Sequence, residues 1–234
     1  DAAGGVSGLT GLVENNSIWL GADPSGTTST AAYNVSLGTT ALDTITTGDN
    51  NSAIGYGALT ALTTGEQNTA VGSAALDANS TGDKNTALGY NALTANTTAD
   101  YNVAIGRGAM TNNSTGANNT AVGTAALDGN TTASNNTAVG YNCLVTNSTG
   151  ADNTAVGVNA LQLNATTANN TAVGKSALAN NIAANNTAVG KSALAENTTG
   201  TTNTALGSVA LNANTTGGQN VGIGSEALDA NTTA

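Results

Sequence analysis

The sequence predicts an all-β fold, a parallel β-solenoid or β-roll of twelve coils. Its phrase NTAVG at 136–140 recurs, lightly varied, to the end of the chain, and the glycine of that phrase returns every 17 residues from Gly38 to Gly224, with one spacing of 16 between Gly174 and Gly190. With no Phe and only 3% aromatic residues, the chain suits a narrow core repeated along an axis better than one globular core. Each unit is also too short to hold a strand, turns and two helical turns.

The first 33 residues do not follow the period. We expect residues 1–33 to form an N-terminal cap with a degenerate first coil, since NSIWLG at 16–21 reads as a stretched NTAVG phrase. Trp19 is the only Trp, and we interpret it as a lid over the first coil because terminal repeats must close the core. Residues 34–234 form the repeat domain.

Each unit is numbered here 1 to 17 from its first Asn, so that Asn34 is position 1 of the first unit. Stacked at the strand spacing of about 4.8 Å, identical Asn side chains can hydrogen-bond from coil to coil, and Asn tolerates the left-handed backbone of turns. The sequence therefore predicts a structural Asn ladder. Its members are Asn34, Asn51, Asn68, Asn85, Asn102, Asn119, Asn136, Asn153, Asn170, Asn186, Asn203 and Asn220.

Positions 2 to 5 alternate as a strand does. Position 3 is Ala or Gly in every unit except at Ser36, so it is expected to face a tight lumen. The Ala-Leu pair at positions 8 and 9 gives a second apolar row for that lumen. The aliphatic residue at position 4 then points outward, as at Val122, Val139, Val156 and Val173. We expect the remaining NTTG-like tail to form turns and a polar outer loop.

An outward aliphatic row of this length indicates an interface. Three coils packed around a common axis would bury it, so we predict a homotrimer with Val122, Val139, Val156 and Val173 in its oligomer-facing row.

Four acidic residues share position 16 of consecutive units: Asp49, Glu66, Asp83 and Asp100. Like charges stacked at strand spacing repel, and a bound Ca²⁺ would relieve that repulsion. A solvated column whose charges are screened by salt is the competing and preferred interpretation. Apart from this calcium hypothesis, no cofactor is predicted.

Composition excludes several function classes. A net charge of −10 with four cations argues against nucleic-acid binding and against docking to anionic membranes. Without His, the chain lacks His-based nucleophile systems and metal sites, and we predict no catalytic residues. The sequence contains no run of about 20 apolar residues, so we expect no membrane insertion by this segment. Cys143 replaces the Ala of the other units, which predicts a small buried residue.

The phrases NVAIG at 102–106, NSAIG at 51–55 and NVGIG at 220–224 resemble the repeats of trimeric adhesin heads, the YadA-like head family, and 17-residue arrays of this kind also look like segments of bacteriophage and other viral fibres. The resemblance implies a left-handed parallel β-roll, a trimer, and a role in attachment or as a fibre shaft on a virion or bacterial surface. The family's usual unit is a few residues shorter, and its resemblance transfers no catalytic residues.

The sequence thus predicts a non-enzymatic, extracellular, trimeric fibre segment that presents a surface to a host receptor or glycan, in a chain expected to continue beyond residue 234. Two alternatives remain at this point. The uniform units also suit a self-assembling filament or spacer. Recurrent Thr at position 2 suggests an ice-binding solenoid, although Val replaces it at Val35, Val103 and Val221.

Overall fold

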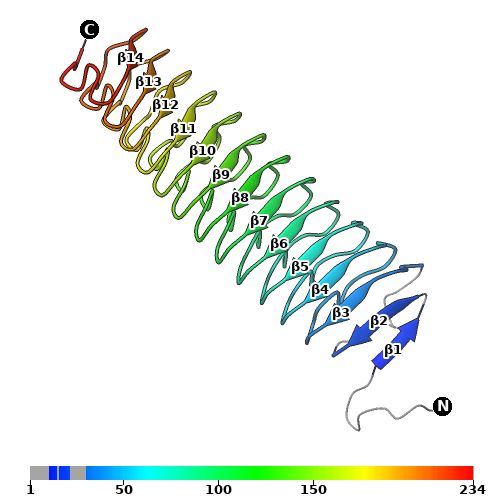
Figure 1. The fold of residues 1–234 in the computed structure, drawn as a ribbon. Coiled ribbons are helices and arrows are strands. Elements are labelled where there is room, and N and C mark those ends of the chain that lie inside the picture. Colours follow the sequence, from blue (N-terminus) through cyan, green and yellow to red (C-terminus); the bar gives the residue numbers. More distant parts are fainter. Residues whose placement is uncertain (1–10, 15, 22–29, 234) are drawn as a thin grey trace.

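The computed structural model describes residues 11–14, 16–21 and 30–233, and it shows coils stacked in a single row along one axis (Figure 1). The described residues contain no helix, and all strands belong to one 14-stranded sheet in sequence order. Strand β1 (Gly11–Glu14) pairs with β2 (Ser17–Leu20) antiparallel, and every later pairing is parallel. The later strands are β3 (Val35–Leu37), β4 (Ser52–Ile54), β5 (Thr69–Val71), β6 (Thr86–Leu88), β7 (Val103–Ile105), β8 (Thr120–Val122), β9 (Thr137–Val139), β10 (Thr154–Val156), β11 (Thr171–Val173), β12 (Thr187–Val189), β13 (Thr204–Leu206) and β14 (Val221–Ile223). The predicted all-β parallel solenoid is confirmed.

The strands pair in register, so each repeat position forms a straight column along the axis. Val122 of β8 lies beside Val139 of β9, and Thr120 beside Thr137. Even the 16-residue unit keeps this register, with Thr171 of β11 beside Thr187 of β12. The missing residue is therefore absorbed outside the strand.

Most residues of each coil lie in turns, because each strand from β3 onward has only three residues. Backbone hydrogen bonds between coils continue through these turns, for example from the Leu93 N–H to the Ala109 carbonyl at 2.9 Å. Positions 7, 9 and 17 have positive φ, and at position 9 the residue is a buried Leu such as Leu127, with φ 54°.

The recurring glycine at position 5 is required by both conformation and space. Gly123 has a φ of +139°, and a Cβ built on it would lie 2.5 Å from the carbonyl oxygen of Gly140 in the next coil. L-residues rarely adopt that backbone region. The glycine therefore turns the chain out of the strand while neighbouring coils touch backbone to backbone.

The lumen contains the side chains that the pattern placed there. In the coil that begins with β8, Ala121, Ala126 and Leu127 are fully buried, and the other complete coils repeat this arrangement with Cys143 and Met110 as variants. One part of the prediction is wrong: the NTTG-like tail is no outer loop. Its Asn and the small residue three positions later are buried and close the third side of the coil.

The Asn of the tail, at position 12, forms a second buried ladder. The amide nitrogen of Asn96 donates to the side-chain oxygen of Asn79 at 3.0 Å, and Asn113 donates to Asn96 at 3.1 Å. In the first two coils Ile45 and Leu62 occupy this position. These side-chain hydrogen bonds form two runs. One joins Asn79, Asn96, Asn113, Asn130, Asn147 and Asn164, and the other joins Asn181, Asn197, Asn214 and the half-buried Asn231. At the short coil between them, the Asn181 amide donates to the Ala183 carbonyl at 2.6 Å.

The two ladders meet at the carbonyl of position 15. The Gly82 carbonyl accepts from the side-chain amide of Asn68 at 2.8 Å and from that of Asn79 at 2.9 Å. Both lone pairs of this buried oxygen are thus used, as the cost of unpaired buried polar groups requires.

A residue of the preceding coil compensates for the residue that the short coil lacks. Where the other coils carry Gly or Ala at position 15, the coil before the short one carries Thr167. The Thr167 hydroxyl accepts from the side-chain amide of Asn170 at 3.3 Å and lies 3.1 Å from the Ala183 carbonyl. Together with the Asn164 side-chain oxygen, 3.4 Å from the same amide, it supplies the acceptors for Asn170 that a position 15 carbonyl supplies elsewhere.

At the N-terminal end, Trp19 lies on β2 beside Ser36 of β3 and is 1% exposed. Its side chain belongs to the continuous core, on the inward side, and fills the first coil from within. Of the predicted cap at 1–33, residues 1–10, 15 and 22–29 lie outside the described part of the chain.

Candidate functional site

The outward face of the parallel sheet is the first candidate surface. In each strand the middle residue points into the lumen, while positions 2 and 4 point out. Position 4 is aliphatic in all twelve coils and forms what we call the aliphatic column: Leu37, Ile54, Val71, Leu88, Ile105, Val122, Val139, Val156, Val173, Val189, Leu206 and Ile223.

The predicted oligomer-facing residues lie in the middle of this column, each in register with the next. Val156 and Val173 are each 36% exposed, and Val122 and Val139 are half-buried. The Leu members are more open, with Leu88 at 46% and Leu206 at 47%. The column is therefore continuous from β3 to β14, and none of its side chains is needed to fill the lumen.

The outward sheet face carries no charge. Position 2 is Thr, Ser or Val in every coil and position 4 is always aliphatic, so within residues 30–233 the acidic side chains lie on the other sides of the coils. This neutral, partly apolar strip differs chemically from the rest of the surface.

The position 1 ladder has a structural role at every coil. The side-chain oxygen of Asn102 accepts from the Asn119 backbone N–H at 3.0 Å, and the side-chain amide of Asn119 donates to the Ala133 carbonyl at 2.9 Å. One Asn thus ties its coil to the next and closes its own coil. All twelve are buried except the half-buried Asn220.

The three Asp residues at position 16 use their carboxylates to accept from backbone amides, whereas Glu66 takes part through its backbone N–H. Asp49 accepts from the Ala32 N–H at 2.7 Å, Asp83 from Glu66 at 2.7 Å, and Asp100 from Asp83 at 2.8 Å. In a later coil the Ser134 hydroxyl fills the same role for the Ala117 N–H at 3.0 Å. The column therefore caps the edge of the preceding coil.

Within the described ranges no three acidic, His or Cys side chains are disposed to hold a metal ion. The predicted column of Asp49, Glu66, Asp83 and Asp100 is real as a row, but its members are not gathered into a ligand set. Calcium binding there has no geometric support.

Cys143 lies inside the lumen with its thiol 3.1 Å from the Ala155 carbonyl. Burial raises the pKa of this thiol to about 12, against the lowering effect of nearby backbone groups of Val139 and Gly157. The thiol is therefore protonated at neutral pH and unsuited to nucleophilic chemistry.

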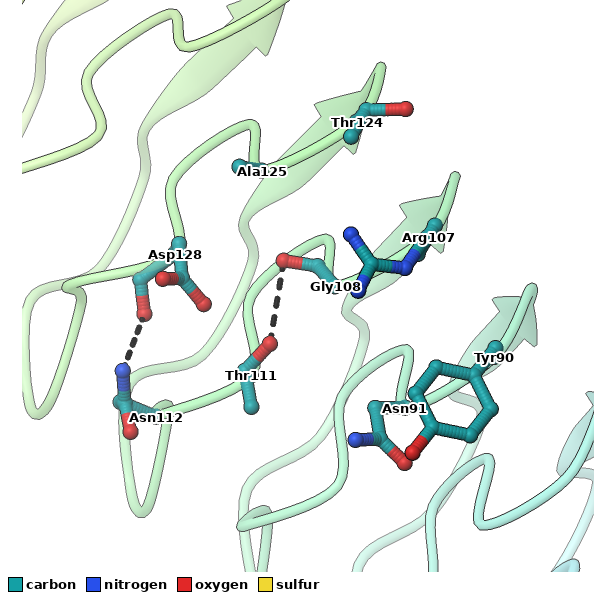
Figure 2. A pocket seen from close by; sticks show the side chains of 9 residues that line it. All are labelled: Tyr90, Asn91, Arg107, Gly108, Thr111, Asn112, Thr124, Ala125 and Asp128. Atoms are coloured by element: carbon teal, nitrogen blue, oxygen red, sulfur yellow. Dashed lines mark hydrogen bonds between the residues drawn. The ribbon is translucent and has the colours of Figure 1, made fainter.

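A hollow of about 250 Å³ opens at the corner after β7, and sequence reasoning missed it (Figure 2). Tyr90 and Arg107, both at position 6, stand on one side of it, Gly108 follows Arg107 in the chain, and Asp128 lies on the opposite side. The signal was present in the sequence: Arg107 is the only Arg, and a glycine follows it where most coils carry a side chain.

No helix in the described part of the chain is long and apolar enough to cross a membrane. Comparison with protein-family models, with curated proteins and with solved structures returns no match to this chain.

Proposed function

We propose that this chain is a non-enzymatic fibre segment that assembles with two further copies through the aliphatic column and presents its remaining sides for attachment to a host cell or substrate. The observation that carries the proposal is the column itself, which runs through all twelve coils without a polar interruption. The resemblance of the NVAIG-type phrases to trimeric adhesin heads and viral fibres supports three as the number of copies and an extracellular location.

A second copy of the chain is the partner that fits this face best. Neighbouring side chains of the aliphatic column are one coil apart. A second copy lying parallel has the same separation, so the two columns can contact each other along their full length. The chain carries a net charge of −10, and two copies approaching through any charged side would repel. The outward sheet face is the side on which that repulsion is smallest.

The free energy available from burying the column is comparable with the cost of association. Complete burial of an aliphatic side chain is worth about 1.5–3 kcal/mol, and column residues such as Leu88 and Val156 leave 46% and 36% of their surface exposed. Each therefore contributes about 1 kcal/mol, and twelve contribute on the order of 10 kcal/mol per chain. Association costs about 4–15 kcal/mol, so a stable complex requires the whole length of the column.

Sedimentation equilibrium of the purified chain tests the proposal, with Val156→Asp as the disrupting variant. The matched control is Val158→Asp, which places the same charge two residues away, at position 6, on a side chain that is already 41% exposed. We expect a trimer for the unchanged chain and for Val158→Asp, and a weakened one for Val156→Asp because a buried unpaired charge is costly. A monomer would refute the interface, and open filaments would refute the closed trimer. A monomer with thermal hysteresis would favour the ice-binding alternative.

A further inference from the structure

The hollow after β7 lies beside Gly108, one of the two glycines at repeat position 7. Gly108 lies there between Asn91 and Ala125 of the neighbouring coils. A Cβ built on Gly108 would meet only the Thr111 hydroxyl, at 3.4 Å, so the space above the glycine is open. Its φ of +64° is one that Asn and Ala adopt at the same position in the adjacent coils. The glycine is therefore not required by the fold.

The side chains around this hollow have unused binding capacity. In Figure 2 the Tyr90 ring and the Arg107 guanidinium stand on one side and the Asp128 carboxylate on the other. No hydrogen bond or ion pair engages the Arg107 guanidinium within the described residues. Lys84 differs: its ammonium donates to the Tyr101 hydroxyl at 2.8 Å. Arg107 is thus a cation without an internal partner at the edge of a cavity.

We propose that this hollow binds an acidic sugar unit of a glycan, such as a terminal sugar carrying a carboxylate. A guanidinium offers paired N–H donors that match a carboxylate. The exposed Tyr90 ring supplies an apolar surface for the C–H face of a sugar, and Asp128 supplies acceptors for sugar hydroxyls. The volume of about 250 Å³ is below the range of about 300–1,000 Å³ typical of drug-sized ligands, which limits the ligand to about one ring.

A cation at position 6 followed by glycine at position 7 occurs in one unit of the repeat domain. Gly57 is the other glycine at position 7, but Tyr56 precedes it and no cation is present at position 6 of that coil. Lys175 and Lys191 are cations at position 6, and Ser176 and Ser192 follow them. The site therefore departs from the repeat at two adjacent residues, and the fold explains neither departure.

Titration calorimetry on the full chain tests the site with N-acetylneuraminic acid and glucuronic acid as probes and galactose as the neutral comparison. We expect saturable binding of at least one acid and at least tenfold weaker binding of galactose. Arg107→Ser should weaken binding at least tenfold, and Gly108→Asn should abolish it by filling the hollow. Serine and asparagine occur at these positions elsewhere, as at Ser73 and Asn142, so both variants should fold.

Lys175→Ser and Gly57→Asn are the matched controls, since they make the same exchanges at the same repeat positions in other coils. Absence of binding by both acids, equal binding of galactose, or unchanged binding by Arg107→Ser or Gly108→Asn would each overturn the inference. The inference rests on the proposed attachment role. Sedimentation of the same samples reports assembly separately, so a failed sugar site and a failed trimer are distinguishable.

Discussion

Replacing Asn119 by Ala tests whether the position 1 ladder holds the coils together. The Asn119 side-chain oxygen accepts from the Asn136 N–H at 2.9 Å, and its amide donates to the Ala133 carbonyl at 2.9 Å and to the Asn102 side-chain oxygen at 3.2 Å. Truncation to Ala removes all three hydrogen bonds from a fully buried position.

The three losses are unequal in cost. The Ala133 carbonyl keeps a second donor, the side-chain amide of Asn130 at 2.9 Å. The Asn102 oxygen keeps the Asn119 backbone N–H at 3.0 Å. Only the Asn136 N–H is left buried without an acceptor, at a cost of about 1–3 kcal/mol. The two other bonds add roughly 0.5 kcal/mol each, the low end of the usual range, because their partners keep a hydrogen bond, so the expected destabilisation is about 3 kcal/mol.

Amide hydrogen exchange is the appropriate assay, because repeat arrays can open locally and need not unfold as one unit. A local loss of about 3 kcal/mol corresponds to roughly a hundredfold faster exchange of the Asn136 amide. Asn112→Ala is the control, since that exposed side chain makes one hydrogen bond, to the Asp128 carbonyl at 3.0 Å. Exchange at Asn136 that rises less than tenfold, or rises equally in both variants, would refute the reasoning.

Three further predictions, two of them with a control variant, concern other parts of the coil and are tested by urea denaturation. Gly123→Ala should cost more than 3 kcal/mol or prevent folding, since its Cβ would lie 2.5 Å from a backbone oxygen. Gly108→Ala should cost only about 1–2 kcal/mol, the strain of Ala at a φ of +64°, because its Cβ would meet no backbone atom; equal midpoints would contradict this. Burial raises the pKa of the Cys143 thiol to about 12 in the folded chain, against 9.0 for the unfolded thiol. The free energy of unfolding should therefore fall by about 1.4 kcal/mol per pH unit above pH 9.0, and Cys143→Ala should remove this fall. Thr167→Gly, although it restores the common residue, should cost about 0.5–1.5 kcal/mol through one lost hydrogen bond to the Asn170 amide, which keeps the Asn164 side-chain oxygen at 3.4 Å. Ala133→Gly is the control and should cost less, and a neutral Thr167→Gly would show that the hydroxyl does not stabilise the short coil.

The sequence predicts the parts of this fold that depend on periodicity. The strand at positions 2 to 4, the lumen-facing Ala-Leu pair and the outward direction of Val139 all follow from alternation and from the 17-residue spacing. They could be predicted because the coils repeat, so a position that faces the lumen in one coil faces it in the others.

The tail was misjudged because polarity is an ambiguous signal. An isolated Asn such as Asn147 is expected at the surface, yet here it is fully buried. Burial is favourable only because Asn130 and the Gly150 carbonyl satisfy its amide at 3.1 and 2.9 Å. That compensation depends on stacking between coils, which no single unit displays.

The hollow at Arg107 and Gly108 escaped prediction for a different reason. It arises from two departures from the repeat, and the period identifies only what recurs. The left-handed backbone of Leu127, with φ 54°, is likewise set by the closure of the coil and contradicts the usual preference of Leu.

The composition of position 4 supports an interface more strongly than its exposure alone does. Positions 2 and 4 both point out from the same three-residue strand, so strand formation makes similar demands on both. Position 2 nevertheless accepts Thr, Ser and Val, whereas position 4 is aliphatic in every coil and is Leu at Leu37, Leu88 and Leu206. Strand propensity does not explain this difference, because Thr is enriched in strands along with Val and Ile. Nor does the lumen, which Ala, Leu and the two Asn ladders already fill. An exposed Leu such as Leu206, at 47% exposure, therefore fits the proposal that a partner surface covers this column.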